Sequence, residues 1–341
     1  MSEEPFSVEQ YDDIDGVVSP ASNQRLIGHD QTIAQLSGAA AGGKLHHAWV
    51  LQGPRGVGKA TAAFAFAREL LSGSQDPTSH AATARQIAGG GHPQLIHLSR
   101  PKSEKGTFRT QITVTEIRRL NHFFQTTVGA GWRVAIIDPA DDLNRNAANA
   151  LLKILEEPPQ RCIFLIVNHS AGRLLPTIRS RCRILRFLPL ASSAIEEILR
   201  GIGRGDSAED LRSAAHASDG SVRTALTLLE NGGLEITETL RTLMAAGESD
   251  WSAVLQMADA LSVKGREAAF AFMASELLRL VGISAETSLE SGNQRKAAAY
   301  ARLWQAEQAR WREAEAYNLD RRQTLVSFFE RYRAARAIGD D

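Results

Sequence analysis

The sequence predicts an α/β protein with a parallel sheet covered by helices on both faces, followed by an all-helical region. Apolar runs typical of buried strands alternate with amphipathic helical stretches up to residue 187, which is the pattern of a parallel sheet. The first of these runs ends in a glycine-rich turn that opens directly into a helix. After Pro189 the strand pattern stops, and every later segment has helical spacing.

The glycine-rich turn carries a phosphate-binding pattern. Residues 45–71 read LHHAWVLQGPRGVGKATAAFAFARELL, in which Gly53, Gly58 and Lys59 fit G-x-x-x-x-G-K and Gly56 lies between them. Backbone N–H groups of such a loop cradle phosphates, the following helix adds its positive end, and the lysine reaches the terminal phosphates. An ordinary strand–turn–helix corner is the alternative, but the strand before the turn and the Ala-rich helix after it favour a phosphate loop.

Two positions of this phosphate site lack the usual chemistry. The residue after the lysine is normally Ser or Thr, whose hydroxyl holds Mg²⁺. Here it is Ala60, with Thr61 one position later and about 100° around the helix. Residues 133–138, RVAIID, predict a buried strand that delivers Asp138 to the edge where such proteins place their second Mg²⁺ contact, and a simple strand end is the alternative. The next residue, Pro139, has no side chain that could polarise a water molecule.

The remaining elements of the α/β region follow from composition and periodicity. A helix is expected within 22–43, and residues 72–93 predict an insertion or long connection because they are small, polar and glycine-punctuated. Thr113 or Thr115 can cap the next helix. The other expected elements are a strand at 94–98, a polar loop at 100–111, a helix at 144–157, a strand at 162–167, a short helix at 173–179 and a strand at 182–187.

The C-terminal part is predicted to be helical throughout. Helices are expected at 194–199, 208–215 and 220–230, then, after a hinge at Gly232–Gly233, at 251–262, 265–282 and 294–337. The last segment carries aromatic residues at helical spacings, which predict core or subunit contacts rather than a cofactor site. These residues are Trp304, Trp311, Tyr317, Phe328 and Phe329.

Composition is that of a globular protein of two or three domains, with 341 residues, 43% apolar and 23% charged. Lys plus Arg and Asp plus Glu balance at 39 each, so no global basic field argues for nucleic acid. Cys162 and Cys182 lie in apolar strand-like runs, which fits a reducing cytosol. No apolar run approaches the length expected of a membrane span, and the acidic N-terminus does not resemble a secretion signal.

Two stretches are strongly polarised in charge. Residues 1–20 contain six acids and no bases, which predicts a solvated tail or a docking strip, and the tail is favoured. Residues 161–190 contain six arginines and no acid, which predicts a solvated basic face or an arginine presented across an interface to a phosphate, with duplex backbone nearby. The six are Arg161, Arg173, Arg179, Arg181, Arg183 and Arg186.

Taken together, these stretches resemble the AAA+ clamp-loader subunits of bacterial DNA polymerase III, most closely those of the delta-prime type. The series LLPTIRSRC at 174–182 is diagnostic of the clamp-loader branch, and the likeness covers residues 22–232, with a looser match at 316–325. The matching stretches are 45–60, GGGHPQLIHL at 89–98, ITVTEIRRL at 112–120, VAIIDPADDLNRNAANALLKILEEPP at 134–159, FLIVNHSAGRLLPTIRSRC at 164–182 and GSVRTALTLLE at 220–230.

The resemblance implies a domain plan and a set of partners. After the acidic N-terminal tail, taken as 1–21 from its charge, it implies a RecA-like AAA+ domain with a parallel sheet at 22–188, a small helical lid at 189–233 and a helical collar at 234–341. The collar would join a five-subunit ring with motor (gamma/tau) and delta subunits. The sliding clamp and primer–template DNA would be bound through the assembly, in the bacterial cytoplasm at the replisome, without a membrane.

The resemblance also implies roles for individual residues. Arg181 stands at the arginine finger, which reaches the ATP of the neighbouring subunit in trans. The nucleotide-binding positions are Gly53, Gly56, Gly58, Lys59, Ala60 and Thr61 in the phosphate loop, Asp138 at the strand end, Asn168 at the first sensor and Arg223 at the second sensor. Family members often carry four cysteines before the His-Pro pair, but residues 73–91 contain none, so no zinc and no other metal site are expected.

Ala60 and Pro139 decide which member this is, because motor subunits keep both the hydroxyl and the glutamate at these positions. Both losses imply a subunit that holds ATP or ADP without hydrolysing it, has no activity by itself, and serves the polymerase holoenzyme by lending Arg181 during clamp loading in DNA replication. A guanidinium at a developing γ-phosphate charge raises rates ~10³–10⁵-fold in related systems. The alternatives are an ATP-hydrolysing motor subunit or helicase loader, in which Asp141 replaces the missing glutamate, and a nucleotide-independent scaffold with a vestigial loop.

Overall fold

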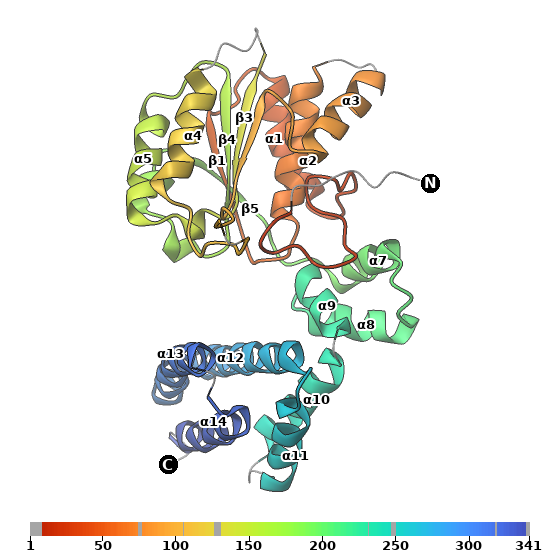
Figure 1. The fold of residues 1–341 in the computed structure, drawn as a ribbon, viewed down its shortest axis with the longest axis vertical. Coiled ribbons are helices and arrows are strands. Elements are labelled where there is room, and N and C mark those ends of the chain that lie inside the picture. Colours follow the sequence, from red (N-terminus) through yellow and green to blue (C-terminus); the bar gives the residue numbers. More distant parts are fainter. Residues whose placement is uncertain are drawn as a thin grey trace. The chain divides into compact units, whose positions relative to one another are not determined.

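The computed structural model describes residues 9–73, 77–104, 106–125, 131–230, 232–246, 250–317 and 319–338. The chain divides into two compact units, each with its own core (Figure 1). The first unit holds the residues up to Gly205 together with Ala215–Thr224, and the second holds Asp206–Ala214 and the residues from Ala225 onward.

The first unit contains a five-stranded parallel sheet, which confirms the predicted RecA-like α/β fold (Figure 1). The strands lie in the order β2-β3-β4-β1-β5, and all of their pairings are parallel. Gln52 at the end of β1 lies opposite Asn168 at the end of β4, so the two carboxyl ends meet at one edge. The strands are β1 (Ala48–Gln52), β2 (Leu95–Leu98), β3 (Arg133–Ile137), β4 (Cys162–Asn168) and β5 (Arg183–Arg186).

Alternate residues of each strand face two separate helical layers. In β1, Ala48 and Val50 belong to one apolar cluster, whereas Trp49 and Leu51 belong to the other. The strands therefore read as continuous apolar runs, because both faces of the sheet are covered. One layer is α1 (Asp30–Ala41), α2 (Lys59–Ser72) and α3 (Pro77–Ala88), and the other is α4 (Val114–Gln125), α5 (Arg145–Glu156) and α6 (Pro176–Arg179) (Figure 1).

Local caps explain where two helices of the second layer begin. The Thr113 backbone N–H and hydroxyl both donate to Glu116, at 2.8 and 2.7 Å, which closes a capping box at the start of α4. Asn144 accepts a 2.9 Å hydrogen bond from the N–H of Ala147 and caps α5. The starts of both helices were expected from the sequence. Of the two capping residues left open for α4, the structure shows Thr113.

One element was missed by the sequence analysis. The stretch 72–93, expected to be a connection, contains α3, whose Ile87 side chain is 1% exposed and packs with the α2 face of the sheet. Its small and polar residues gave no clear apolar stripe, and its helical order depends on packing against α2. Short 3₁₀ turns also occur at Ala140–Asp142 and Ala171–Arg173.

Three short helices follow the sheet, as the sequence predicted. They are α7 (Ser192–Ile202), α8 (Ala208–Ala217) and α9 (Val222–Leu229). The division into two units passes through this region, so the expected boundaries of a separate lid at 189–233 and a collar at 234–341 remain predictions.

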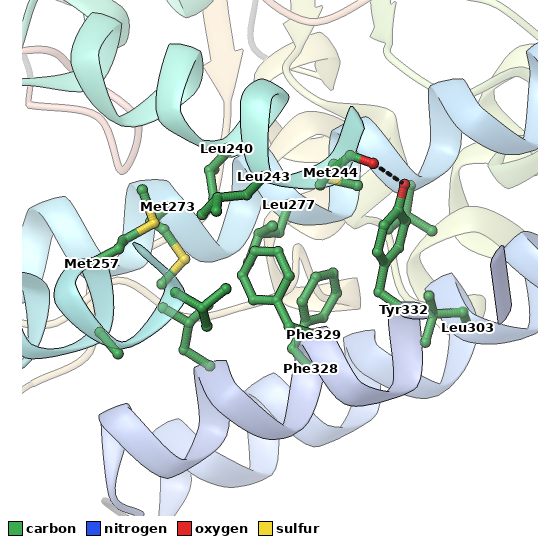
Figure 2. Packing of buried hydrophobic residues seen from close by; sticks show 14 of the residues in the cluster. Leu240, Leu243, Met244, Met257, Met273, Leu277, Leu303, Phe328, Phe329 and Tyr332 are labelled. Atoms are coloured by element: carbon green, nitrogen blue, oxygen red, sulfur yellow. Dashed lines mark hydrogen bonds between the residues drawn. The ribbon is translucent and has the colours of Figure 1, made fainter. Parts of the chain in front are cut away.

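The second unit has a core built by five further helices. They are α10 (Gly233–Ala245), α11 (Trp251–Ser262), α12 (Glu267–Glu290), α13 (Gln294–Ala316) and α14 (Arg321–Arg336). Phe328 and Phe329 of α14 lie among the leucines and methionines of α10, α11 and α12, and the Tyr332 hydroxyl donates to the Met244 carbonyl at 3.2 Å (Figure 2). Trp311 is also buried there, but Trp304 and Tyr317 are 38% and 73% exposed, so these two are not core residues.

Helix α12 corrects one expectation from the sequence. It is 24 residues long with a mean hydropathy of 1.5 over its most apolar window, so by length and composition alone it is able to cross a bilayer. Its Met273, Leu277 and Val281 side chains are fully buried in the helical core, and the carboxylate of Glu276 is buried beside Arg279. Only 28% of that apolar window is buried inside the structure, and one such helix is weak evidence for a membrane span, because core helices and signal sequences pass the same test.

Candidate functional site

The glycine-rich turn lies between β1 and α2 at the carboxyl edge of the sheet, and its glycines are required sterically. Gly56 and Gly58 have φ of +81° and +100°, which residues with a Cβ rarely adopt. A Cβ on Gly53 would lie 2.1 Å from the Phe187 carbonyl oxygen, and one on Gly56 would lie 2.3 Å from Ser221 Oγ. The backbone of the loop is therefore packed against β5 on one side and against the start of α9 on the other.

Lys59 begins α2 with its ammonium group turned back over the loop. Its side chain is 3% exposed, and Nζ donates to the carbonyls of Gly53, at 2.7 Å, and of Pro54. Burial lowers the pKa of Lys59 to about 8, while the charges of Asp138 and Asp141 oppose this shift. The cation is thus held by carbonyl oxygens at the mouth of the phosphate loop, within the field of two carboxylates.

Asp138 follows β3 at the same edge of the sheet, as expected. Burial raises the pKa of Asp138 to about 7, the charge of Asp12 adds to the rise, and Lys59 and Arg55 oppose it. Pro139 comes next and supplies neither a carboxylate nor an N–H. Asp138 therefore lies beside the phosphate loop, whereas the position expected for a water-activating glutamate is occupied by the pyrrolidine ring of Pro139.

Asp141 is the nearby acid that could replace that glutamate, and its carboxylate already accepts three hydrogen bonds. Oδ2 accepts from Asn168 Nδ2 at 3.1 Å and from the His169 N–H at 2.7 Å, and Oδ1 accepts from the Ser170 N–H at 2.8 Å. Two backbone donors and one amide hold the charge in place. Asp141 thereby fixes the end of β4 and is poorly suited to take a proton from water.

Asn168, the expected first sensor, lies at the centre of this network. It is fully buried, its Nδ2 donates to Asp141 and to the Ser170 carbonyl, both at 3.1 Å, and its Oδ1 accepts from Gln52 at 3.3 Å. The neighbouring His169 is kept neutral, because burial and the Lys59 charge lower its pKa to about 4. The amide is thus placed next to the phosphate loop, with its polar atoms paired to β1 and to Asp141.

The first turn of α2 lacks a hydroxyl at the usual position for a metal contact. Ala60 follows the lysine there, and Thr61 is half-buried one residue further along the helix. Among the described residues, no group of three or more His, Cys, Asp or Glu side chains could hold a metal ion. The absence of zinc remains a prediction.

Arg223, the expected second sensor, is held by the N-terminal segment. Both of its terminal nitrogens donate to the Asp12 carbonyl oxygen, one of them at 2.8 Å, and Nη2 lies 3.6 Å from Asp12 Oδ2. Arg55 of the phosphate loop donates to the other side of the same residue, with Nη2 3.1 Å from Asp12 Oδ2. The backbone N–H of Val222 also donates to the Gly56 carbonyl at 3.0 Å, so the start of α9 is attached directly to the loop.

Arg181 lies apart from these groups, in the turn after α6. Its Nη2 contacts Glu156 Oε1 at 2.7 Å, and its Nη1 donates to the Thr177 carbonyl at 3.0 Å. The Arg181 side chain is 36% exposed and that of Glu156 is 50% exposed. Among the described residues its hydrogen-bond partners are Glu156, Thr177 and Ser180, and none of these belongs to the phosphate loop.

The structure brings together most of the residues expected at a nucleotide site. Gly53, Gly56, Lys59, Asp138 and Asn168 share the carboxyl edge of the sheet, which is where open α/β sheets bind ligands. The contribution of Asp12 was missed, because nothing in an acidic N-terminal stretch distinguishes a docked segment from a solvated one. The anchoring role of Asp141 was missed because it depends on contacts with residues 27 to 29 positions away.

Comparisons with known proteins agree with this geometry. Residues 28–191 match the family described as DNA polymerase III, delta subunit. The DNA polymerase III subunit delta′ of Pseudomonas aeruginosa is 37% identical over 207 residues, 58% of this chain and 60% of that protein. The subunit gamma of Buchnera aphidicola is 32% identical over 220 residues, 62% and 58% of the two chains. The match spans about three-fifths of the length of these relatives.

Two solved structures show a more distant likeness. The Thermotoga maritima RuvB Holliday junction branch migration motor is 18% identical with a TM-score of 0.41, covering 73% of this chain and 75% of that chain. A gamma subunit-related protein of DNA polymerase III from the same organism is 16% identical with a TM-score of 0.37, covering 89% and 99%.

The sheet, the glycine loop with its lysine and the acid at the end of β3 define an α/β phosphate-loop protein. Within that class, the matching family and the two relatives named above are all described as DNA polymerase III subunits. Residues 28–191 match the family described as DNA polymerase III, delta subunit, and this part of the chain resembles subunits of the delta-prime type.

Proposed function

We propose that this protein is a non-hydrolysing, stator-type subunit of a DNA polymerase III clamp loader that lends Arg181 to the ATP site of a neighbouring motor subunit. The observation that carries the proposal is the contrast between an incomplete phosphate site and an exposed guanidinium held only at a turn. In this proposal the chain binds ATP or ADP without cleaving it. It works in the bacterial cytoplasm beside gamma/tau and delta subunits in a five-membered ring, together with the sliding clamp and primer–template DNA.

The loss of hydrolysis is supported by three positions around Lys59. Ala60 has no hydroxyl for Mg²⁺, Pro139 has no carboxylate for water, and Asp141 already accepts three hydrogen bonds. Phosphoryl transfer depends on charge stabilisation by the metal and on a positioned nucleophile. A site without either support is suited to holding a nucleotide and unsuited to cleaving it.

The role in trans is supported by the chemistry of Arg181. An arginine finger has to leave its own subunit's contacts and enter a neighbour's site, so its partners in the free chain must be weak. Exposed ion pairs such as Arg181–Glu156 typically contribute about 0–1 kcal/mol. The γ-phosphate of a neighbouring ATP carries more charge and offers more acceptor oxygens than one carboxylate.

The decisive experiment measures the part of the ATPase rate of a reconstituted loader that depends on adding this chain. With clamp and primed DNA present, Arg181→Ala should reduce this chain-dependent rate at least about tenfold, because the finger supplies charge that the transition state needs. Arg181→Lys should remain impaired, because lysine lacks the planar fork of donors. An unchanged rate with Arg181→Ala would remove the proposal.

Two control variants separate the alternatives. Arg179→Ala removes an exposed arginine at the end of α6, two positions before Arg181, and should leave the rate within about twofold, since surface changes away from a site are usually small. Lys59→Ala should weaken binding of a fluorescent ATP analogue to the full chain at least about tenfold, since it removes the charge facing the terminal phosphates. Analogue binding that is absent in the wild type would favour a scaffold, and ATP turnover by the isolated chain would favour a motor subunit or helicase loader.

A further inference from the structure

The N-terminal residues 9–13, here called the acidic strap, dock on the phosphate-loop unit. Glu9 pairs with Lys102 at 2.6 Å, and Gln10 Oε1 accepts from Ser99 Oγ at 2.5 Å. The Tyr11 ring packs under the Arg100 guanidinium, 4.1 Å from ring centroid to Cζ. Successive strap residues are thus fixed to the loop that follows β2, which favours the docking-strip interpretation of this segment over the solvated tail.

Asp12 is the strap residue that enters the phosphate site. It lies between Arg55 of the phosphate loop and Arg223 of α9, and it uses both its carboxylate and its backbone carbonyl to accept from them. Asp12 and Asp138 also line the same cavity of about 460 Å³, which lies beside the end of β2. One carboxylate of the chain itself therefore offsets part of the positive charge of two arginines, Arg55 in the phosphate loop and Arg223 at the start of α9.

A nucleotide and Asp12 would compete for the same positive charges. The two guanidinium groups that contact Asp12 are the groups a triphosphate would use once bound next to Lys59, since arginine binds phosphate oxygens in preference to a lone carboxylate of lower charge. Asp12 also places negative charge near Asp138, and this proximity repels an incoming phosphate. Binding at the loop is opposed as long as the strap is docked.

We propose that the acidic strap is an internal ligand of the phosphate site, which a nucleoside triphosphate displaces when it binds. This inference rests on the proposed function in one respect, namely that the phosphate loop of this chain binds nucleotide. ATP should displace the strap more effectively than ADP, because it brings more negative charge to Arg55 and Arg223. By linkage, the nucleotide and the docked strap each weaken the binding of the other by the same factor.

The test is a titration of the full chain with a fluorescent ATP analogue. Asp12→Asn should lower the Kd about three- to tenfold, since it removes the carboxylate charge that pairs with Arg55 and lies 3.6 Å from Arg223, although the backbone carbonyl that accepts from Arg223 remains. Asp15→Asn is the matched control, because it removes the same charge from an exposed carboxylate two residues beyond the strap, and it should change the Kd less than about twofold. Tyr11→Ala, which removes the stacking on Arg100, should lower the Kd in the same direction as Asp12→Asn.

A second measurement reads the strap itself. Backbone hydrogen exchange of residues 10–17 in the wild-type chain should become faster at saturating ATP analogue. Equal Kd values for wild type, Asp12→Asn and Tyr11→Ala would overturn the strap proposal, as would unchanged exchange. If Lys59→Ala still abolished binding in that case, the nucleotide site would stand without the strap. If no variant bound the analogue, the strap would have nothing to oppose, yet the Arg181 role, read from the neighbour's ATPase, would remain intact.

Discussion

The phosphate loop region and the Arg181 turn treat their charged groups in opposite ways. Around the loop, Lys59 is buried on backbone carbonyls, Asp141 accepts three hydrogen bonds and Arg223 is held by Asp12. At the turn, Arg181 has one exposed carboxylate and one carbonyl as its main partners. The charged groups around the phosphate loop are therefore already hydrogen-bonded within the chain. Arg181, which can give up its contacts at a lower free-energy cost, lies elsewhere.

This difference shows that a phosphate-loop motif alone does not identify which side chains are available to react. A polar group that is already hydrogen-bonded inside the protein has to lose those bonds before it acts, at a cost of about 1–3 kcal/mol for each buried group left unpaired. A solvated ion pair costs far less to break. The following predictions test this contrast, beginning with the largest effect.

Replacing Asp141 with alanine should destabilise the chain by about 2 kcal/mol, because the Asn168 amide and the His169 N–H lose a charged acceptor. Urea denaturation followed by circular dichroism measures the change. Asp15→Ala removes an exposed carboxylate and should stay within about 0.5 kcal/mol. A variant of normal stability that lost an ATPase activity present in the wild-type chain would instead identify Asp141 as a catalytic base.

Replacing Asp138 with asparagine should stabilise the chain at pH 8 by on the order of 1 kcal/mol and have little effect at pH 5. The folded pKa of Asp138 is raised from 3.8 to about 7. Between these values the folded state binds the proton that the unfolded state has lost, so this group's contribution to stability falls as the pH rises. Unfolding curves at the two pH values check the sign, and a larger gain at pH 5 would contradict it.

Replacing Glu156 with glutamine should have the smallest effect. Because both partners of the Arg181–Glu156 pair are exposed, the free energy of unfolding should change by less than about 0.5 kcal/mol. The chain-dependent ATPase rate of the assembled loader should stay within about twofold of the wild-type rate, in contrast to that of Arg181→Ala. A tenfold change would mean that Glu156 positions the finger and that the two regions are less different than the free chain indicates.

The sheet and the phosphate loop were predictable because their signals are local. Each strand is a short apolar run with a polar end, and the loop is defined by glycines and a lysine within seven consecutive residues, Gly53 to Lys59. The parallel order then brings Asn168 and Asp138 to the same edge as the loop. Helix α3 was not predictable in this way, because its sequence has no clear apolar stripe and its order depends on packing against α2.

The state of the site was not predictable, because it depends on contacts between distant residues. Asp12 and Arg223 are 211 positions apart, and no periodicity or turn signal connects them. The hydrogen bonds that Asp141 accepts likewise depend on the close approach of the ends of β3 and β4. Sequence patterns therefore predicted which residues gather at the site, whereas side-chain pairing decides which of them are available to react.

The helical unit has one further consequence, in how the chain is made. Arg336 in α14 donates to the carbonyls of Met244 and Ala245, 91 to 92 residues earlier, at the end of α10. The contact therefore joins α10, the first of the five core helices, to α14, which is synthesised after the other four. All five strands of the sheet have been synthesised once β5 is complete. Because domains tend to fold in order of synthesis, the sheet would fold during translation. The helical core that contains α10 would form only after α14 has been synthesised.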